Sequence, residues 1–255
     1  MRFFNLFLIL NVYFYYIHVI IILGVIMEKF DRLKLLVGDK FDYIKNKRVL
    51  IIGLGGVGGY AFEALVRSGI ENFIIVDNDT IDVTNLNRQI ISTTNNIGKS
   101  KVIEAKNRAL LINPSVNIKT IDDFITLDNI NSLFLDKIDY IVDACDTITV
   151  KLELIRISKQ KNIKLISSMG TGNKMDPSKF KICDVRNTSY DPIAKIIRKM
   201  VKDEKIKGKV MVVSSTEKGI HKNISTIPSN SYIPALSGIL CASYVINDIV
   251  GDLHV

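Results

Sequence analysis

The sequence predicts an α/β fold built on a doubly wound, mostly parallel sheet. Short apolar runs rich in β-branched residues alternate with helical patterns over residues 49–168, and this alternation is typical of parallel sheets covered by helices on both faces. The first run leads into a glycine-rich turn that opens a helix, as in Rossmann-like sheets. A length of 255 residues suits one such domain with small additions.

The elements of this sheet can be placed from the periodicity of the apolar residues. Strands are expected where short apolar runs lie between polar turns, and helices where apolar residues recur at intervals of three and four. After Gly170 the periodicity weakens, so we expect a small α+β extension at the C-terminal end. The predicted strands are 49–52, 73–76, 116–121, 138–142, 164–166, 180–185 and 209–214. The predicted helices are 27–38, a helix that follows the glycine-rich turn and is ended by Gly69, 98–112, 127–135, 151–160, 191–205 and 234–250. Residues 41–45 are expected to link to the first strand, and residues 215–231 to form a loop.

Residues 1–26 form a largely apolar leader outside this pattern. In a helix, residues 3–26 would span about 36 Å, which exceeds the roughly 30 Å of a bilayer core. The segment has no polar region with a small-residue cleavage site, as a signal peptide would have. Two explanations remain open: a membrane helix, or translation that begins at Met27. We favour the second, because nothing downstream requires a membrane.

Composition favours a cytosolic protein that is tethered to a membrane only if residues 1–26 are translated. The three cysteines are isolated, so neither a structural zinc site nor a disulfide framework is indicated. None of the three histidines lies beside a Ser or Cys in a nucleophile context, which argues against a Ser–His or Cys–His hydrolase. The net charge of +8 is compatible with an RNA partner, and a solvated lysine-rich surface explains it equally well.

A nucleotide site is predicted at the glycine-rich turn. Gly53, Gly55, Gly56 and Gly58 connect the first strand to its helix, and the second strand ends at Asp77. Glycines allow the backbone to approach phosphate groups, whose charge is stabilised by free N–H groups at the helix N-terminus. A carboxylate after the second strand can accept hydrogen bonds from ribose hydroxyls. The alternative is a glycine-rich turn that only joins core elements.

Polar residues after the later strands favour ATP over a nicotinamide cofactor. Asn85 and Arg88 lie in the loop after the second strand, and Lys101 begins the next helix. Cations there can stabilise the charge of a departing pyrophosphate. Asp146 follows the fourth strand at the carboxyl edge of the sheet, where a carboxylate can hold the Mg²⁺ that bridges phosphates. Each residue alone could be an ordinary surface group, but their common edge favours the joint interpretation.

The same residues fall in motifs that resemble the adenylating enzymes related to ubiquitin-activating enzyme, which include the ThiF and MoeB proteins. The resemblance implies a ThiF-type adenylating domain over residues 27–255. By that resemblance, the four glycines, Asp77 and Asp79 bind ATP, Asn85, Arg88 and Lys101 contact its phosphates, and Asp146 is the magnesium-linked catalytic aspartate. The matching motifs are G-L-G-G-V-G at 53–58, D-N-D at 77–79, T-N-L-N-R-Q at 84–89, G-K-S-K at 98–101 and D-A-C-D at 143–146.

The resemblance also implies a homodimer. Arg32, in the segment Phe30-Asp31-Arg32, resembles the arginine that reaches across such a dimer to the ATP of the partner. It would then join Arg88, Lys101 and Asp146 as a catalytic residue. From its own surroundings alone, Arg32 is a surface charge in a short amphipathic helix.

Within this family, the sequence resembles the tRNA threonylcarbamoyladenosine dehydratases. The zinc-binding cysteine pairs of sulfur-carrier activators are missing, and residues 167–177, 191–195 and 213–217 match the dehydratase pattern. The resemblance implies that ATP activates the carboxylate of threonylcarbamoyladenosine at position 37 of tRNA. The ureido group of the modification then closes a ring, with net loss of water. Because this attack is intramolecular, it needs no enzyme thiol, so Cys145, Cys183 and Cys241 can all be structural.

Other functions remain open at this stage. An adenylating activator of a small sulfur-carrier protein has the same fold, and a cysteine desulfurase or another sulfur-acceptor protein could be a partner. A catalytically silent nucleotide-binding module would not need Arg88, Lys101 and Asp146 together, and a nicotinamide dehydrogenase is a more distant alternative. The segment 195–209 has seven basic and two acidic residues, which suits either a tRNA partner or a solvated surface.

Overall fold

The computed structural model describes residues 28–221 and 226–251. The expectations for the leader 1–26 fall outside these residues, as does the part of the predicted loop at 222–225. The chain divides after Gly38 into two compact units. The first contains the helix α2 (Asp31–Val37), which is shorter than the predicted helix 27–38. The second contains all other described elements and the predicted nucleotide residues from Gly53 to Asp146.

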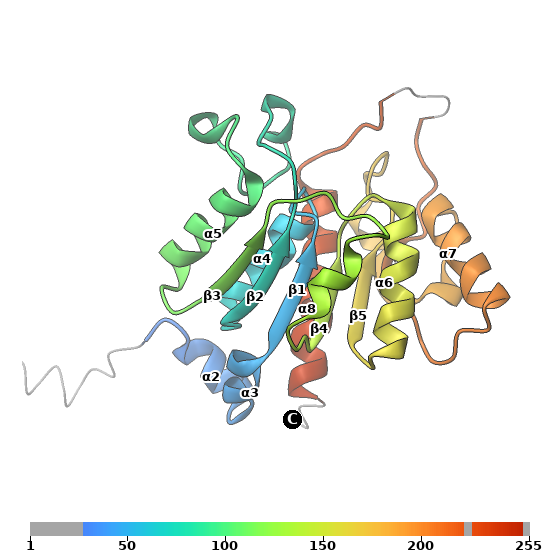
Figure 1. Ribbon diagram of the computed structural model, residues 1–255. Helices are drawn as coiled ribbons and strands as arrows, with labels where there is room; N and C mark the ends of the chain where they lie inside the picture. Colours follow the sequence, from blue (N-terminus) through green and yellow to red (C-terminus); the bar gives the residue numbers. More distant parts are fainter. Residues whose placement is uncertain (1–27, 222–225, 252–255) are drawn as a thin grey trace, which may run out of the picture. The chain divides into compact units, whose positions relative to one another are not determined.

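A seven-stranded sheet lies at the centre of the second unit (Figure 1). Its order is β3-β2-β1-β4-β5-β7-β6, and all neighbouring strands are parallel except β6, which runs antiparallel to β7. The predicted doubly wound, mostly parallel sheet is confirmed, and the C-terminal extension continues that sheet as β7 and β6. The strands are β1 (Arg48–Ile52), β2 (Asn72–Val76), β3 (Asn117–Ile121), β4 (Tyr140–Asp143), β5 (Lys164–Ser168), β6 (Phe180–Asp184) and β7 (Met211–Ser215).

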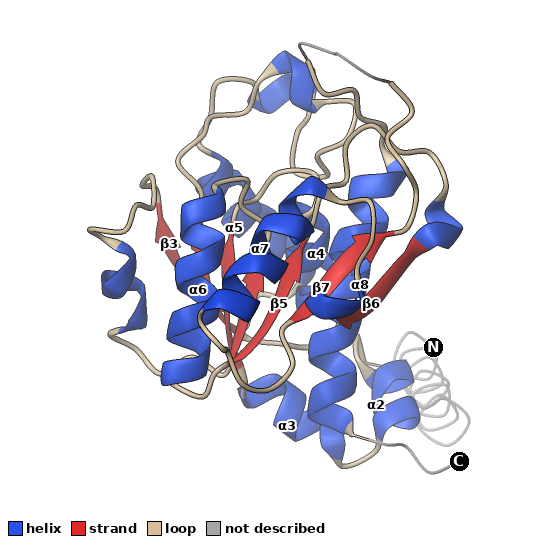
Figure 2. Ribbon diagram, turned by 90° about the vertical axis from the view of Figure 1, so that its right-hand side faces the viewer, coloured by secondary structure: helices blue, strands red, loops and turns tan. Residues whose placement is uncertain are grey.

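Helices cover both faces of the sheet (Figures 1 and 2). On one face α8 packs on α4 and α3, and α4 also contacts α5. On the other face α6 packs against α7. The helices of this unit are α3 (Lys40–Asn46), α4 (Gly58–Arg67), α5 (Lys101–Ile112), α6 (Ile148–Gln160), α7 (Pro192–Asp203) and α8 (Tyr232–Val250).

The central strands are buried on both sides, which explains their uninterrupted apolar sequences. Side chains alternate along a strand, so Leu50 and Ile52 of β1 join a cluster with Leu154 of α6 and Ile197 of α7. Val49 and Ile51 of the same strand point to the opposite face and are equally buried. The carboxyl edge of this rigid core is the platform that holds the candidate site.

Among the described residues, α8 is the one helix whose length and composition would allow it to cross a membrane. Its mean hydropathy is 1.6. Half of this stretch is buried inside the structure, and Ile233, Cys241 and Val245 are fully buried. The helix packs against α4 and against β5 and β7. Its apolar composition is therefore that of a helix packed in the core.

The helix predicted at 127–135 is wrong, because the segment forms only the 3₁₀ turn Ile130–Phe134. Polar side chains compete here for the backbone. The side-chain oxygen of Asn129 accepts a hydrogen bond from Thr126 N at 2.8 Å, and the Ser132 hydroxyl donates to Asn129 O at 2.7 Å. These local bonds stabilise turns instead of a regular helix.

Several other boundaries differ from the prediction by a few residues. The helix predicted from Gly98 begins at Lys101, because Gly98 has φ +83° and an isolated bridge pairs Thr80 with Ser100. The link expected at 41–45 lies in the helix α3. The predicted helix 191–205 is α7 with Asp191 as its N-cap, whose side chain accepts a hydrogen bond from Ala194 N.

Candidate nucleotide site

A cavity of ≈ 350 Å³ opens at the carboxyl edge of the sheet, beside the ends of β1, β2 and β4. It lies where the chain crosses from one side of β1 to the other, which is where ligands bind in open α/β sheets. Its size falls in the range of small-molecule sites. The predicted residues that line it are Gly53, Gly55, Gly56, Asp77, Asp79, Asn85, Arg88, Lys101 and Asp146.

Two of the glycines are required by close backbone packing. Gly53 has φ +85°, and a Cβ there would lie 2.6 Å from Ala144 O. A Cβ on Gly58 would lie 1.7 Å from Gly53 O. Gly58 is not among the residues that line the cavity. It lets α4 start directly against the end of β1, whereas Gly55 and Gly56 line the cavity itself.

Asp77 fastens the glycine turn to the end of β2. One of its carboxylate oxygens accepts a hydrogen bond from Leu54 N at 2.6 Å, and the other accepts from Asp79 N at 2.9 Å. Burial raises the pKa of Asp77 above its ordinary value, although the nearby Lys101 amino group and these two bonds oppose the rise. Each carboxylate oxygen has a second acceptor position, so Asp77 can also accept from a ligand hydroxyl.

The two cations of the site already have partners on the protein. Lys101 is 4% exposed, and its amino group lies 2.6 Å from Asp79 and 3.8 Å from Asp77. Arg88 donates one hydrogen bond to Thr84 O at 2.8 Å and another to the side chain of Asn87 at 3.0 Å. These contacts restrain both cations at the cavity, and each keeps N–H groups that can donate to a phosphate.

Asn85 shapes the loop that carries Arg88. Its side-chain oxygen accepts from Asp82 N at 3.1 Å, while the Asp82 carboxylate accepts from Thr84 N at 2.8 Å. This reciprocal pair caps the 3₁₀ turn Val83–Asn85 and buries Asn85 beside the cavity. Asn85, the predicted phosphate contact, therefore also caps the loop that carries Arg88.

Asp146 is an exposed carboxylate that lines the cavity. Within the described residues its side chain makes no hydrogen bond or salt bridge. The preceding residue, Cys145, also lines the cavity and is half-buried. Burial and the neighbouring Asp143 raise the pKa of the Cys145 thiol, so this sulfur is protonated at neutral pH and is a poor nucleophile.

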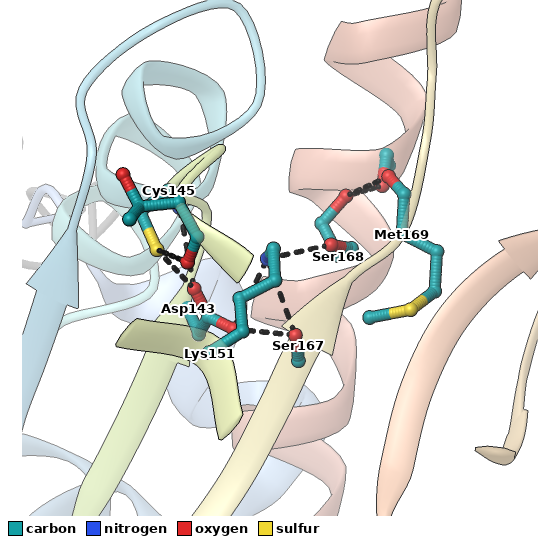
Figure 3. Close-up of polar contacts among 8 residues, drawn as sticks. Asp143, Cys145, Lys151, Ser167, Ser168 and Met169 are labelled. Carbon is teal, nitrogen blue, oxygen red and sulfur yellow. Dashed lines mark hydrogen bonds and ion pairs between the residues drawn. The ribbon is translucent and has the colours of Figure 1, made fainter. Parts of the chain in front are cut away.

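A buried polar network supports the turn that carries Asp146 (Figure 3). The amino group of Lys151 lies 3.1 Å from Asp143 and donates to Ser168 O at 2.9 Å. The Ser167 hydroxyl donates to Asp143 at 2.5 Å, and Cys145 N donates to Asp143 at 3.2 Å. Burial would lower the pKa of Lys151, but the Asp143 carboxylate outweighs it and raises the pKa, so the amino group is charged.

Lys151 and Ser167 were not predicted as supporting residues, and Asp143 was predicted only as part of the D-A-C-D motif. A usable signal was present, because Lys151 is a charged residue beside Val150 in a stretch whose other inward residues, Leu154 and Ile155, are apolar. Gln89 was also not predicted as a site residue. It lines the cavity, and its side-chain oxygen has no hydrogen-bond partner among the described residues.

Arg32 belongs to the first unit, whereas the residues that line the cavity belong to the second. It is an exposed residue of α2, in the first of the two units, and its side chain makes no hydrogen bond or salt bridge within residues 28–221 and 226–251. Its predicted role across a dimer therefore stays a prediction. The other predicted catalytic residues, Arg88, Lys101 and Asp146, share the cavity.

Comparison with known proteins identifies the relatives of this chain. A model of the ThiF family matches residues 30–250. The tRNA threonylcarbamoyladenosine dehydratase of Bacillus subtilis is 34% identical over 247 residues, which is 90% of this chain and 97% of that protein. The Escherichia coli protein of the same name is 33% identical over 178 residues, 69% of this chain and 66% of that protein. The crystal structure of E. coli TcdA in complex with ATP has a TM-score of 0.81 at 30% identity, covering 87% of this chain and 93% of that one.

Proposed function

The chain belongs to the ThiF family, and from this premise we propose that it catalyses the ATP-dependent dehydration of threonylcarbamoyladenosine at position 37 of tRNA. The observation that carries the proposal is the meeting of Arg88, Lys101 and Asp146 in one cavity. It is supported by the match to a dehydratase of B. subtilis over 97% of that protein. The solved E. coli dehydratase complexes contain ATP and AMP, the substrate and a product of such a reaction.

ATP is the substrate that the cavity fits best. The glycine turn at Gly55 and Gly56 exposes backbone at the start of α4, where N–H groups attract negative charge. Arg88 and Lys101 provide two cations for the polyphosphate. Charged donors fixed in place before the reaction stabilise developing charge without reorganisation in the transition state. In this proposal, Asp77 orients the turn and binds the ribose.

Mg²⁺ would be held by Asp146 together with the phosphates. No group of three or more His, Cys, Asp or Glu side chains forms a complete metal site in the described part of the chain. Magnesium in phosphate-binding sites commonly uses one or two carboxylates plus phosphate oxygens and water. The unpaired carboxylate of Asp146 at the cavity wall fits that donor set. When bound, the ion would neutralise part of the charge on the polyphosphate.

The reaction has two steps. A carboxylate oxygen of the threonylcarbamoyl group attacks the α-phosphorus of ATP, and the bond to pyrophosphate breaks, leaving an acyl-adenylate. The ureido group of the modification then attacks the acyl carbon, loses its proton and releases AMP as the ring closes. The second step needs no enzyme nucleophile because the reacting groups belong to one molecule. The raised pKa of Cys145, the thiol at the cavity, suits this route.

We further propose a homodimer in which Arg32 reaches the ATP of the partner subunit. We expect the protein to act in the cytosol, where ATP and tRNA are available, and residues 27–255 to form the adenylating domain. We also propose a cysteine desulfurase or sulfur-acceptor protein as a candidate partner, because one relative, 35% identical over 131 residues, is named as an adenylyltransferase and sulfurtransferase.

The function is tested by offering the full chain two substrates with Mg-ATP. Threonylcarbamoyl-modified tRNA should stimulate AMP release, and mass spectrometry should show a loss of one water at position 37. Unmodified tRNA of the same sequence is the matched control and should give no stimulation. If a small carrier protein with a Gly-Gly tail stimulates pyrophosphate exchange and modified tRNA does not, the chain is a sulfur-carrier activator. No turnover with either substrate would indicate a silent nucleotide-binding module.

A further inference from the structure

We propose that the outer face of α7, together with Tyr190 and Lys218 at its start, is the surface that binds the tRNA. This inference rests on the proposed function and names the part of the molecule that holds its large substrate. In Figure 2 the helix lies across the front of the molecule, beside α6. The surface is defined here as Tyr190, Lys195, Lys199, Lys202 and Lys218, and is called the α7 surface below.

Three lysines form a regular row on this helix. Lys195, Lys199 and Lys202 are spaced by four and three residues, which places them on one side of a helix. The opposite side is buried through Ala194 and Ile197. From Lys195 to Lys202 the row extends about 10 Å along the axis, and all three residues are exposed.

The amino groups of these lysines are available to an outside anion. Within the described residues none of them makes a hydrogen bond or salt bridge, unlike Arg156, which pairs with Glu204 at 2.6 Å. Because the Glu204 carboxylate is paired with Arg156, it does not neutralise these lysines. Asp203 is the exposed carboxylate that remains in α7. A row of unpaired lysines is the electrostatic footprint of a phosphate backbone.

Tyr190 adds a second, independent feature at the start of the helix. It is 61% exposed, although tyrosine is mostly a buried or half-buried residue. Its φ is +60°, which is rare for a non-glycine residue, and Asp191 N donates to Ser189 O at 2.8 Å around it. The amino group of Lys218 lies 4.8 Å from the ring centroid. An exposed ring beside a cation is the usual platform on which an unpaired RNA base stacks.

The α7 surface is connected directly to the nucleotide cavity. Asp191, next to Tyr190, accepts hydrogen bonds from Ala194 N at 3.0 Å and from Gly170 N at 2.9 Å. Residue Thr171, after Gly170, lines the cavity. Lys174 is buried and pairs with Asp191 at 3.3 Å. RNA held along α7 would therefore have its unpaired loop at Tyr190, whose neighbour Asp191 is hydrogen-bonded to the backbone beside the cavity-lining Thr171.

The lysine row is tested by the salt dependence of tRNA binding to the full chain. The variant Lys195→Gln/Lys199→Gln/Lys202→Gln should lower the slope of log K against log salt by about 2 to 3, since each lost phosphate contact removes close to one unit. The matched control is Lys40→Gln/Lys106→Gln/Lys137→Gln, with the same change of net charge outside α7. It should retain the wild-type slope. Equal slopes for the two triple variants would overturn the proposal.

Tyr190 is tested by a pair of substitutions that keep a side chain at the same backbone angle. Tyr190→Leu should bind tRNA about 5- to 150-fold more weakly, the range for one lost base stack, with an unchanged salt slope. Tyr190→Phe keeps the ring and should bind like the wild type. If Tyr190→Leu binds tRNA as tightly as the wild type, Tyr190 does not belong to the α7 surface and the stacking role is contradicted.

These experiments separate the two proposals. If the wild type dehydrates modified tRNA and the α7 variants bind tRNA normally, the binding surface is wrong and the function stands. If modified tRNA is neither bound nor processed by the wild type, the function itself fails. If the α7 surface binds an acidic protein in place of RNA, the triple lysine variant should bind tRNA as tightly as the wild type. That result would also overturn the inference.

Discussion

Among single residues, the charged groups of the cavity differ in how far they are already paired. Lys101 is held by Asp79 and Asp77, and Arg88 donates to Thr84 O. Asp146 has no such partner among the described residues, although it shares the cavity. Paired cations are kept in position for phosphates, whereas an unpaired carboxylate is free to take a metal ion. Because Asp146 is exposed and unpaired, its substitution should affect catalysis much more than folding.

We expect Asp146→Ala to abolish AMP formation and to leave the fold intact. The side chain is exposed, so its removal leaves no buried cavity and no unsatisfied polar group. AMP release with modified tRNA measures the activity, and thermal unfolding measures the stability. Asp128→Ala, which removes an exposed carboxylate that is not in the cavity, should keep full activity. A fully active Asp146→Ala protein would contradict the assignment.

We expect Arg88→Ala to cost ~2–4 kcal/mol of transition-state stabilisation, the scale for one preorganised electrostatic donor. The measurement is kcat/KM for ATP at saturating modified tRNA. Asn87→Ala is the control, because it removes one acceptor of the guanidinium and leaves the cation in place. Its effect should be much smaller. Equal small effects of both variants would mean that Arg88 only supports the loop.

Among secondary-structure elements, a buried ion pair and its hydrogen bonds join β4, α6 and β5. Asp143 ends β4, Lys151 lies in the first turns of α6, and Ser167 lies near the end of β5. Both charged side chains are at most 1% exposed. Since Cys145 N also donates to Asp143, the pair restrains the turn that presents Asp146. The network thus couples the stability of the sheet edge to the geometry of the site.

We expect Lys151→Met to destabilise the protein by about 3–5 kcal/mol, because it leaves the Asp143 carboxylate buried without its partner. Urea denaturation at neutral pH gives the free energy of unfolding. The double variant Asp143→Asn/Lys151→Met removes both charges and should recover part of this loss. A single variant as stable as the wild type would show that Asp143 does not depend on Lys151.

A second pairing between elements predicts a pH dependence. Glu63 of α4 accepts hydrogen bonds from Arg108 of α5 at 2.7 Å and from Arg67 at 2.8 Å. Burial disfavours its charge, but the two arginines outweigh it, so the pKa of Glu63 lies below its ordinary value of 4.5. A lowered pKa means that this stabilisation is present above pH 4.5 and is lost as the pH falls through the folded-state pKa.

Glu63→Gln should therefore unfold about 1 kcal/mol more easily at pH 7, a modest amount because both arginines are partly exposed and screened. The difference from the wild type should shrink as the pH falls below 4.5. Urea denaturation at a series of pH values measures it. A difference that stays constant down to acid pH would show that the ionisation of Glu63 has no part in joining α4 to α5.

For the whole molecule, the predicted catalytic residues are divided between the two units of the chain. Arg88, Lys101 and Asp146 lie in the second unit, whereas Arg32 lies in the first. A homodimer would complete the site if each subunit supplied Arg32 to its partner. Such sharing makes activity depend on assembly, and it can be detected by mixing two inactive variants.

We expect a mixture of Arg32→Ala and Asp146→Ala subunits to recover part of the AMP release that each variant lacks. A mixed dimer has one site with an intact cavity and an intact Arg32 from the partner. A mixture of Arg88→Ala with Asp146→Ala is the control. Both of those residues line the same cavity, so every site of their mixed dimer is defective and no recovery is expected. The same low activity in both mixtures would disfavour the cross-subunit role.

The sequence by itself determined the sheet, the family and the edge of the sheet at which the candidate site lies. The apolar strands, the glycine turn and the polar residues after each strand are local patterns, and in a parallel sheet the carboxyl ends of neighbouring strands meet at one edge. That is why Asp77 and Asp146, far apart in the chain, could be assigned to one cavity before the structure was known.

Only the tertiary structure decided how these residues are held. The partner of Lys101, the pairing of Asp143 with Lys151 and the packing role of Gly58 depend on atoms that meet across different elements. The helix predicted at 127–135 was wrong for a related reason, since Asn129 and Ser132 stabilise turns that apolar periodicity does not report. Periodicity records which side of an element is buried, whereas the partner of a polar side chain is set by distances that exist only after folding.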